Sequence, residues 1–265
     1  QLITGTIGTY TGSGNVAIGD ANTLSSVDHD GVADNIAIGA SALKAANEDS
    51  GNSPHSNVAI GGLSMNALTT GNSNVAIGLN ALKAVTTAGA NVAIGISAGK
   101  EVKASDTVYI GKHSGHDLNA TGATKTTAVG SESAKYYGSG TDSLVSLGTG
   151  CSYIGSLARA SASSTGVTNE TVIGYNAIGQ GANTVVLGSN SVTRSYFSRR
   201  IDIWNPTEED SALGREGSIH FLGENSGGEL HAMAKISGVH KGTDDDEGGV
   251  IQFACNSGSV GETLS

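Results

Sequence analysis

Two acidic segments of this sequence carry carboxylates that could act in catalysis or bind a metal ion. Glu208, Glu209 and Asp210 follow a Trp-Asn-Pro segment. Hydrolysis of a glycosidic bond requires two carboxyl groups about 5–9.5 Å apart on either side of the sugar, and the spacing of adjacent acids in a loop does not provide that geometry. Residues 244–247 are four consecutive acids without the alternating ligand register of a compact calcium loop. We predict that both segments are solvated surface turns.

Two histidine segments carry residue types found in metal sites. His113 and His116 lie beside Asp117, and His29 lies in the Asp-His-Asp segment 28–30. A tetrahedral site needs three or four converging ligands, and a turn brings such residues to the surface as easily as it brings them together. We therefore predict no bound metal.

The sequence also lacks the signatures of the common enzyme classes. It contains no nucleophile elbow with suitable partners, no phosphate-binding Gly-Lys-Ser/Thr loop and no His-Glu-x-x-His motif. Cys151 and Cys255 lie far apart without a second pair of ligands, which favours two free thiols. We expect a protein that is not an enzyme and binds no cofactor.

The few aromatic residues are the candidates for recognition. Tyr136 and Tyr137 lie among Gly and Ser residues of a long insertion, where adjacent exposed rings can stack on a sugar or a protein epitope. Trp204 is the only tryptophan. We take these three as candidate receptor-binding residues. The alternatives are that one tyrosine packs back on the protein and that Trp204 belongs to a small core.

The overall charge excludes one class of partner. The chain has 14 Lys and Arg against 24 Asp and Glu, a formal net charge of −10. Such a chain does not offer the basic surface that a nucleic-acid backbone requires, so we expect no nucleic-acid partner. No stretch of 18 apolar residues occurs, and we expect a protein that is not embedded in a membrane.

An internal repeat dominates the chain, which has 40 glycines in 265 residues. The unit Asn-Val-Ala-Ile-Gly occurs at 15–19, 57–61, 74–78 and 91–95, with Ile in place of Val at 35–39. The first residues of these copies are Asn15, Asn35, Asn57, Asn74 and Asn91, and the last are Gly19, Gly39, Gly61, Gly78 and Gly95. Degenerate copies ending at Gly111, Gly130, Gly155, Gly174 and Gly188 bring the number to ten, and the shortest interval between closing glycines is 14 residues.

This repeat predicts a parallel β-solenoid over residues 15–192. Val and Ile alternate with Ala, which places the branched residues on one face of a strand and Ala on the other. The glycine allows a turn, and segments such as 79–82 after it fit a second, shorter strand. Stacked asparagines would form a hydrogen-bonded ladder. A helix over 42–45 or 81–84 is too short to form alone. A 14-residue coil encloses few side chains, so we expect the Ala face to need another surface to cover it.

The repeat resembles the left-handed parallel β-rolls in the heads of trimeric autotransporter adhesins, whose coils carry Asn-Ser-Val-Ala-Ile-Gly-type units. The same roll occurs in bacteriophage tail fibres with less regular coils, and here only one interval equals 14 residues. In this family three chains pack their rolls side by side, so the resemblance implies a homotrimer.

The composition changes near Thr193. Residues 1–192 contain 20 charged residues, whereas residues 193–265 contain 18 together with all three Phe. Strands are predicted at 196–203, 218–222, 230–236 and 250–254, which makes 193–265 a β-rich distal module. We assign residues 1–14 to a connection with an upstream region.

Three segments of this module, 217–223, 234–239 and 248–253, resemble the region that precedes the self-cleaving intramolecular chaperone of phage tail fibres and endosialidases. In that family the chaperone trimerises the fibre and then cuts itself off, often after a serine. The chain here ends at Leu264-Ser265. The resemblance implies that this end is a chaperone cleavage point.

These observations lead to one functional expectation and two alternatives. We expect the structural and host-recognition part of a homotrimeric phage tail fibre in the virion, joined to upstream tail components and bound to a bacterial surface glycan or outer-membrane protein. The first alternative is the head of a bacterial trimeric adhesin, which would continue into a coiled-coil stalk, although no heptads follow residue 193. The second is a capsule-degrading tailspike, which would need a groove with paired carboxylates.

Overall fold

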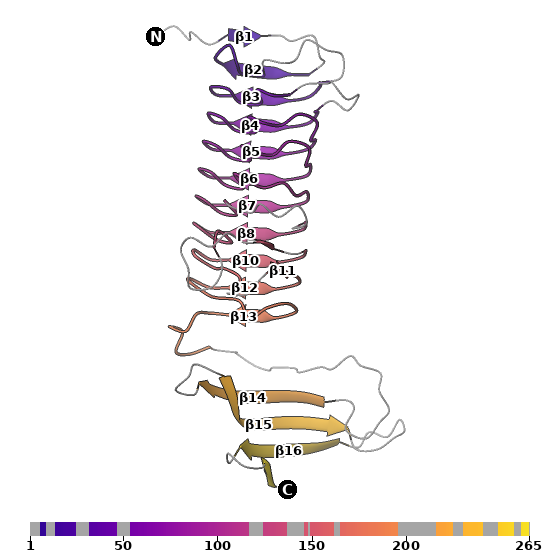
Figure 1. Cartoon of the computed structure of the whole chain (residues 1–265), viewed down its shortest axis with the longest axis vertical. Helices are drawn as coiled ribbons and strands as arrows, with labels where there is room; N and C mark the ends of the chain where they lie inside the picture. The colour runs from indigo at the N-terminus through magenta and orange to yellow at the C-terminus, as the bar shows by residue number, and fades with distance from the viewer. Residues whose placement is uncertain are drawn as a thin grey trace. The chain divides into compact units, whose positions relative to one another are not determined.

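A computed structural model gives the fold of the chain (Figure 1). It describes residues 6–8, 14–24, 32–46, 54–116, 124–136, 146–147, 149–161, 165–195, 216–224, 230–240, 249–256 and 261–264. These residues form strands and turns without a helix, so the chain is all-β as predicted. In particular, they include no helix of the length and apolarity that crossing a membrane requires.

The chain divides into two compact units, Gln1–Thr193 and Arg194–Ser265. The first unit, called the roll below, is a stack of coils that each contribute one strand to a long sheet (Figure 1). The strands that pair in parallel are β2 (Val16–Gly19), β3 (Ile36–Ile38), β4 (Val58–Ile60), β5 (Val75–Ile77), β6 (Val92–Ile94), β7 (Val108–Ile110), β8 (Thr127–Val129), β10 (Ser152–Ile154), β12 (Thr171–Ile173) and β13 (Val185–Leu187). Each of the ten predicted copies is one of these strands, so the β-solenoid is confirmed.

The hydrogen bonds of each strand run to the coils on either side. In the coil of β5, the Val75 N–H donates to the Asn91 carbonyl of the following coil at 2.8 Å. The Gly78 N–H donates to the Ile60 carbonyl of the preceding coil at 2.7 Å. The same two bonds recur along the stack, so the copies lie in register and equivalent residues form columns.

The alternation of each strand appears as predicted, but the role assigned to its alanines was wrong. The central residues, such as Ala76 and Ala93, are fully buried inside the coil, while the residues on either side point outward. Leu82, Val85 and their equivalents in neighbouring coils pack with these alanines in one continuous core. The coil therefore covers its own Ala face, and its Val and Ile face is the one left without a cover.

The segment after each glycine was also predicted wrongly. Residues 79–84 form a turn instead of a second strand, because Asn80 and Leu82 adopt left-handed φ angles of 58° and 47°. Their N–H groups still donate to neighbouring coils, to Gly62 at 3.0 Å and to Ala98 at 3.0 Å. The stack thus satisfies this backbone without strand geometry, which offsets the cost of left-handed residues other than glycine.

The asparagine ladder is present in the structure. The Asn74 backbone N–H and its side-chain Nδ2 both donate to Oδ1 of Asn57, at 2.9 and 3.1 Å, and Nδ2 also donates to the Ala88 carbonyl at 3.0 Å. Asn91 donates in the same way to Oδ1 of Asn74. Asn35, Asn57, Asn74 and Asn91 are fully buried, so the ladder satisfies polar groups that have no access to water.

Beyond Asn91, other residue types occupy the ladder position. Thr107 continues the ladder, since its N–H and its Oγ1 both donate to Oδ1 of Asn91 at 3.1 and 2.6 Å. Thr126, Cys151, Glu170 and Thr184 follow at this position. Cys151 is a buried free thiol, and its Sγ lies 3.1 Å from the Val167 carbonyl. The ladder position therefore remains polar or small even where the repeat degenerates.

Three described strands of the roll unit lie outside this repeat pattern. β1 (Thr6–Gly8) falls within 1–14 and pairs antiparallel with β2. β9 (Ser146–Leu147) and β11 (Thr165–Val167) form a separate parallel pair in two successive intervals, Gly130–Gly155 and Gly155–Gly174. The repeat could not locate these strands because none of them carries its Asn-Val-Ala-Ile-Gly pattern.

The second unit is an antiparallel sheet of β14 (Glu216–Glu224), β15 (Leu230–His240), β16 (Gly249–Asn256) and β17 (Gly261–Leu264), in that order. The predicted strands 218–222, 230–236 and 250–254 are confirmed, each within a longer strand. β17 was not predicted, and the predicted strand 196–203 lies outside the described residues.

We predict that Asn74→Ala lowers the free energy of unfolding by about 2–4 kcal/mol. The change leaves the Ala88 carbonyl and the Asn91 N–H without partners inside the stack, and each unsatisfied buried group costs about 1–3 kcal/mol. Denaturant unfolding followed by circular dichroism measures the change. The matched control is Ser73→Ala at the neighbouring exposed position, where Ala90 already stands in the next coil with the same φ of 58°. Equal stability of the two variants would contradict the ladder's contribution.

We predict that Gly61→Ala lowers the free energy of unfolding by at least about 3 kcal/mol. Backbone strain alone costs about 1–3 kcal/mol, so a larger loss indicates a steric clash. Gly61 has a φ of 127°, and a methyl group there would lie 2.6 Å from the carbonyl oxygen of Gly78. Gly150→Ala is the control, because Gly150 has a φ of 77° and open space around it. Similar melting temperatures for both variants would show that the close contact between coils is not the reason why position 61 requires glycine.

Candidate functional site

One of the three candidate receptor-binding residues lies among the described residues. Tyr136 is half-buried at the end of a described segment, whereas Tyr137 and Trp204 lie outside these segments. The acidic segments 208–210 and 244–247 and the histidine segment 28–30 lie outside them as well.

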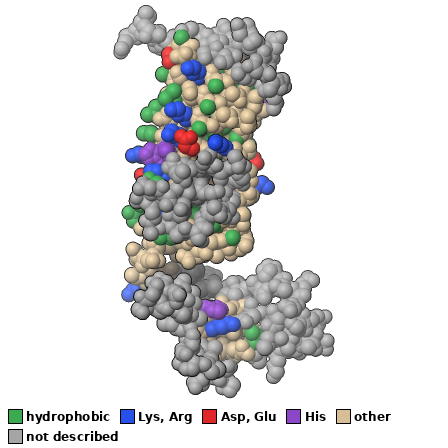
Figure 2. All heavy atoms as spheres, in the orientation of Figure 1, with side chains coloured by type: hydrophobic (Ala, Val, Ile, Leu, Met, Phe, Trp, Pro, Cys, Tyr) green, Lys and Arg blue, Asp and Glu red, His purple; other side chains and the backbone are tan. Residues whose placement is uncertain are grey.

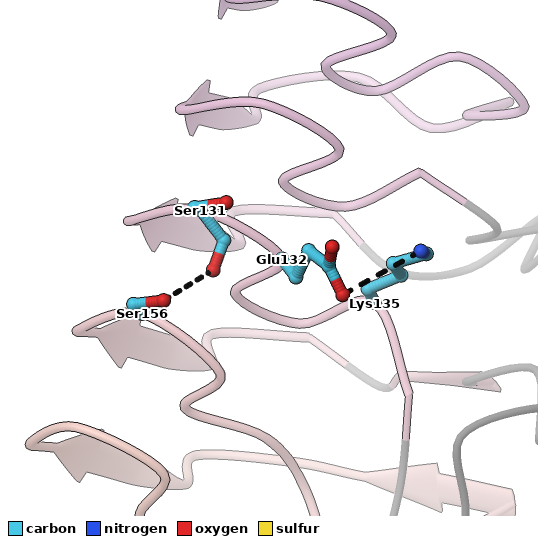
Figure 3. Close-up of polar contacts among 4 residues, drawn as sticks. All are labelled: Ser131, Glu132, Lys135 and Ser156. Carbon is cyan, nitrogen blue, oxygen red and sulfur yellow. Dashed lines mark hydrogen bonds and ion pairs between the residues drawn. The ribbon is translucent and has the colours of Figure 1, made fainter.

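Tyr136 lies at a charged edge of the roll. The Lys135 ammonium group stands 4.5 Å from the centre of the Tyr136 ring, a cation–π contact. The same ammonium lies 3.6 Å from the Glu132 carboxylate, three residues earlier (Figure 3). In the next coil the Ser156 hydroxyl donates to the Ser131 carbonyl at 3.1 Å and joins the two turns (Figure 3). The ring is thus half-buried beside Lys135, and its part in receptor binding stays a prediction.

His113 and His116 lie on the same edge, with ring centroids 5.0 Å apart in an edge-to-face arrangement. Burial lowers the pKa of His113, and the positive charges of Lys135, His116 and Lys112 lower it further, against an opposing effect of Glu132. No group of three His, Cys, Asp or Glu side chains converges within the described segments. The two histidines therefore lie beside the basic side chains of Lys112 and Lys135, and within those segments they have no third ligand.

A buried polar group lies inside the lower coils, away from this edge. The Tyr153 hydroxyl donates to Glu170 at 2.8 Å, and the Gly181 N–H donates to the other carboxylate oxygen at 2.8 Å. Burial raises the pKa of Tyr153 above its ordinary value. Tyr153 and Glu170 are both fully buried, so this pair has no contact with a solvent-borne substrate and serves the packing of the core.

A hollow of about 220 Å³ lies at the last coil of the roll. It is lined by Asn176, Ile178, Gln180, Val186, Gly188, Ser189, Asn190 and Ser191. The amide and hydroxyl groups give it a polar rim, but within this lining there is no ionisable side chain that could act as an acid, base or nucleophile.

The most extensive candidate surface is the outward face of the long sheet, here called the apolar face. It consists of the first and third residues of the ten parallel strands, which are aliphatic at 17 positions and Thr or Ser at the other three. Its isoleucines with exposures of 36–41% are Ile18, Ile36, Ile77, Ile94, Ile110, Ile154 and Ile173. Figure 2 shows hydrophobic side chains along one side of the roll. Sequence reasoning found the alternation but missed that this face points out.

The size of the apolar face makes it a candidate interaction surface. Ten strands at about 4.8 Å per strand make it about 45 Å long and on the order of 400 Å² in area. Patches on single-chain proteins that exceed a few hundred Å² are commonly binding surfaces. The face carries no charged residue, so a partner that covered it would have to be apolar as well.

Comparison of the chain with protein-family models, with curated proteins and with solved structures finds no match.

We predict that the roll loses stability as the pH falls below about 6.5 and that His113→Asn reduces this loss. The pKa of folded His113 lies below its ordinary value of 6.5, so the unfolded chain takes up a proton before the folded chain does. Asn80 and Asn176 hold the equivalent position with similar φ angles, so asparagine fits there. Melting temperatures at about pH 7.5 and 5.5 measure the effect. His55→Asn, at an exposed histidine elsewhere in the roll, is the control. Its melting temperature should fall between the two pH values by as much as that of the unchanged chain.

Proposed function

We propose that this chain is the structural and host-recognition part of a homotrimeric bacteriophage tail fibre, which attaches the virion to a receptor on the bacterial surface. The exposed apolar face is the observation that supports assembly of several chains. The assignment to a tail fibre, and the number of three chains, rest on the resemblance of the repeat and of the C-terminal segments.

A second copy of the chain is the partner that fits the apolar face best. The face repeats at the coil spacing, so equivalent rows on another copy have the same spacing and can interdigitate with it. Burial of apolar area contributes about 25 cal/mol per Å². A face on the order of 400 Å² on each chain thus supplies about 10 kcal/mol per chain before the cost of association.

The stack of coils suits a fibre mechanically and leaves recognition to its edges. Hydrogen bonds between coils run along the stack, so a pull along that direction loads many backbone bonds at once. Insertions of different length leave the coils at their turns, where they vary without disturbing the sheet. Tyr136 and Tyr137 belong to one such insertion. Weak contacts to a surface glycan or an outer-membrane protein, repeated over three chains and several fibres, gain about 10²–10⁴ in avidity.

We predict that the purified chain has the mass of three copies and that Ile77→Glu with Ile94→Glu lowers it to one. Both side chains lie on the outward face, exposed by 36% and 37%, so the core of the coil is unchanged. Charged groups in that face would have to be buried in the assembly at a cost of several kcal/mol. Light scattering coupled to size-exclusion chromatography measures the mass.

The matched control is Asp106→Lys with Lys103→Glu, two exposed positions away from the apolar face, which should keep the trimeric mass. A single-chain mass for the unchanged protein would contradict the proposal. A trimeric mass for the double Ile variant would show that the interface between chains is not the apolar face.

A further inference from the structure

Basic side chains of the roll concentrate at one position of the coil. Residues 1–192 contain eight Lys and Arg, and four of them lie five residues after a strand-closing glycine. His116 lies at the same position in a fifth coil, and Asn66 takes it in the remaining coil of this run. We call this set the basic column: Lys44, Asn66, Lys83, Lys100, His116 and Lys135.

Backbone hydrogen bonds show that these residues are stacked neighbours. The Ala67 N–H donates to the Lys83 carbonyl at 3.1 Å, and the Ala84 N–H donates to the Lys100 carbonyl at 2.9 Å. The Glu101 N–H donates to the His116 carbonyl at 3.0 Å. One such residue therefore follows another along the stack at the coil spacing of about 4.8 Å.

Lys112 adds positive charge beside the column. It lies with His113 on the turn of the same coil as His116, and both Lys135 and Lys112 lower the pKa of His113. Two acids moderate the charge, Glu101 at 3.1 Å from Lys100 and Glu132 at 3.6 Å from Lys135. Figure 2 shows Lys and His side chains gathered over this part of the roll, with acidic side chains among them.

The column is a local row of basic side chains on a chain with a net charge of −10, and most other positions of these coils carry no charge. Such a row is a surface of the roll that attracts an anion. A ligand with anionic groups spaced along a line can pair with it at successive coils.

We propose that the basic column binds a linear acidic polysaccharide of the bacterial surface, which lies along the stack with its carboxylates over Lys44, Lys83 and Lys100. This inference rests on the proposed function, because it names the receptor class of the fibre. A row one residue wide matches a thin flexible chain better than a duplex nucleic acid, which needs a broad basic surface. The half-buried Tyr136 ring beside Lys135 provides an apolar surface for a sugar face.

The test measures binding of the full chain to polygalacturonate, with neutral dextran, duplex DNA and anionic phospholipid vesicles as comparison ligands. Binding to polygalacturonate should weaken with added salt, and Lys83→Gln with Lys100→Gln should lower the affinity about tenfold, since each lost ion pair contributes modestly and the polymer engages several chains. Lys103→Gln with Lys125→Gln removes the same charge from two exposed positions outside the column and should change the affinity less than about twofold.

Several results would overturn the column as a polysaccharide site. These are no binding of polygalacturonate, equal losses in the two double variants, or binding of DNA or vesicles as tight as that of the polysaccharide. Melting temperatures of both variants verify that the roll is intact. If the protein is a monomer yet binds polygalacturonate through Lys83 and Lys100, the polysaccharide site is supported and the trimeric fibre is contradicted. If the trimer adsorbs to bacteria and Lys83→Gln with Lys100→Gln adsorbs equally well, the fibre is supported and the polysaccharide site is contradicted.

Discussion

Hydrogen bonding between coils is the constraint on which the roll depends. A strand of three residues such as β5 has no partner within its own coil, so its N–H and carbonyl groups must pair with the coils before and after it. The buried asparagines extend the same rule to side chains, because each Asn Oδ1 accepts from the backbone and the side chain of the next Asn. A single coil therefore cannot be stable by itself, and stability grows with each neighbour that stacks on it.

The narrow interior limits what each position can hold. Where Tyr109 replaces the usual strand alanine, glycine replaces the large residue of two neighbouring coils, at Gly99 and Gly115. A methyl group at Gly99 would lie 2.9 Å from the Tyr109 ring. The volume that the Tyr109 ring adds is offset by the side chains that Gly99 and Gly115 lack, as close packing of an interior requires. The repeat can thus degenerate at one position only where a stacked neighbour changes with it.

Because alanine fills the interior, the branched residues are left on the outside, and this separates two surfaces. The apolar face has aliphatic side chains in rows and no charge, which suits contact with further copies of the chain. The turns after the glycines carry charged residues, among them Lys83, Lys100 and Lys135, which suits contact with the proposed receptor. Assembly and recognition can then vary independently, since the residues of the turn do not take part in the sheet.

The sequence by itself determined the ten strands, the glycine that closes each of them and the asparagine ladder, because each depends on a local pattern repeated many times. It also located three strands of the C-terminal sheet from runs of β-branched and aromatic residues. Only the tertiary structure decided that the alanines face inward, since an alternation of period two shows which residues share a face and not which face is enclosed. It likewise decided that Asn80 and Leu82 adopt left-handed turns and that Lys83 stacks beside Lys100, because hydrogen bonds to neighbouring coils, and not local preference, set the backbone there.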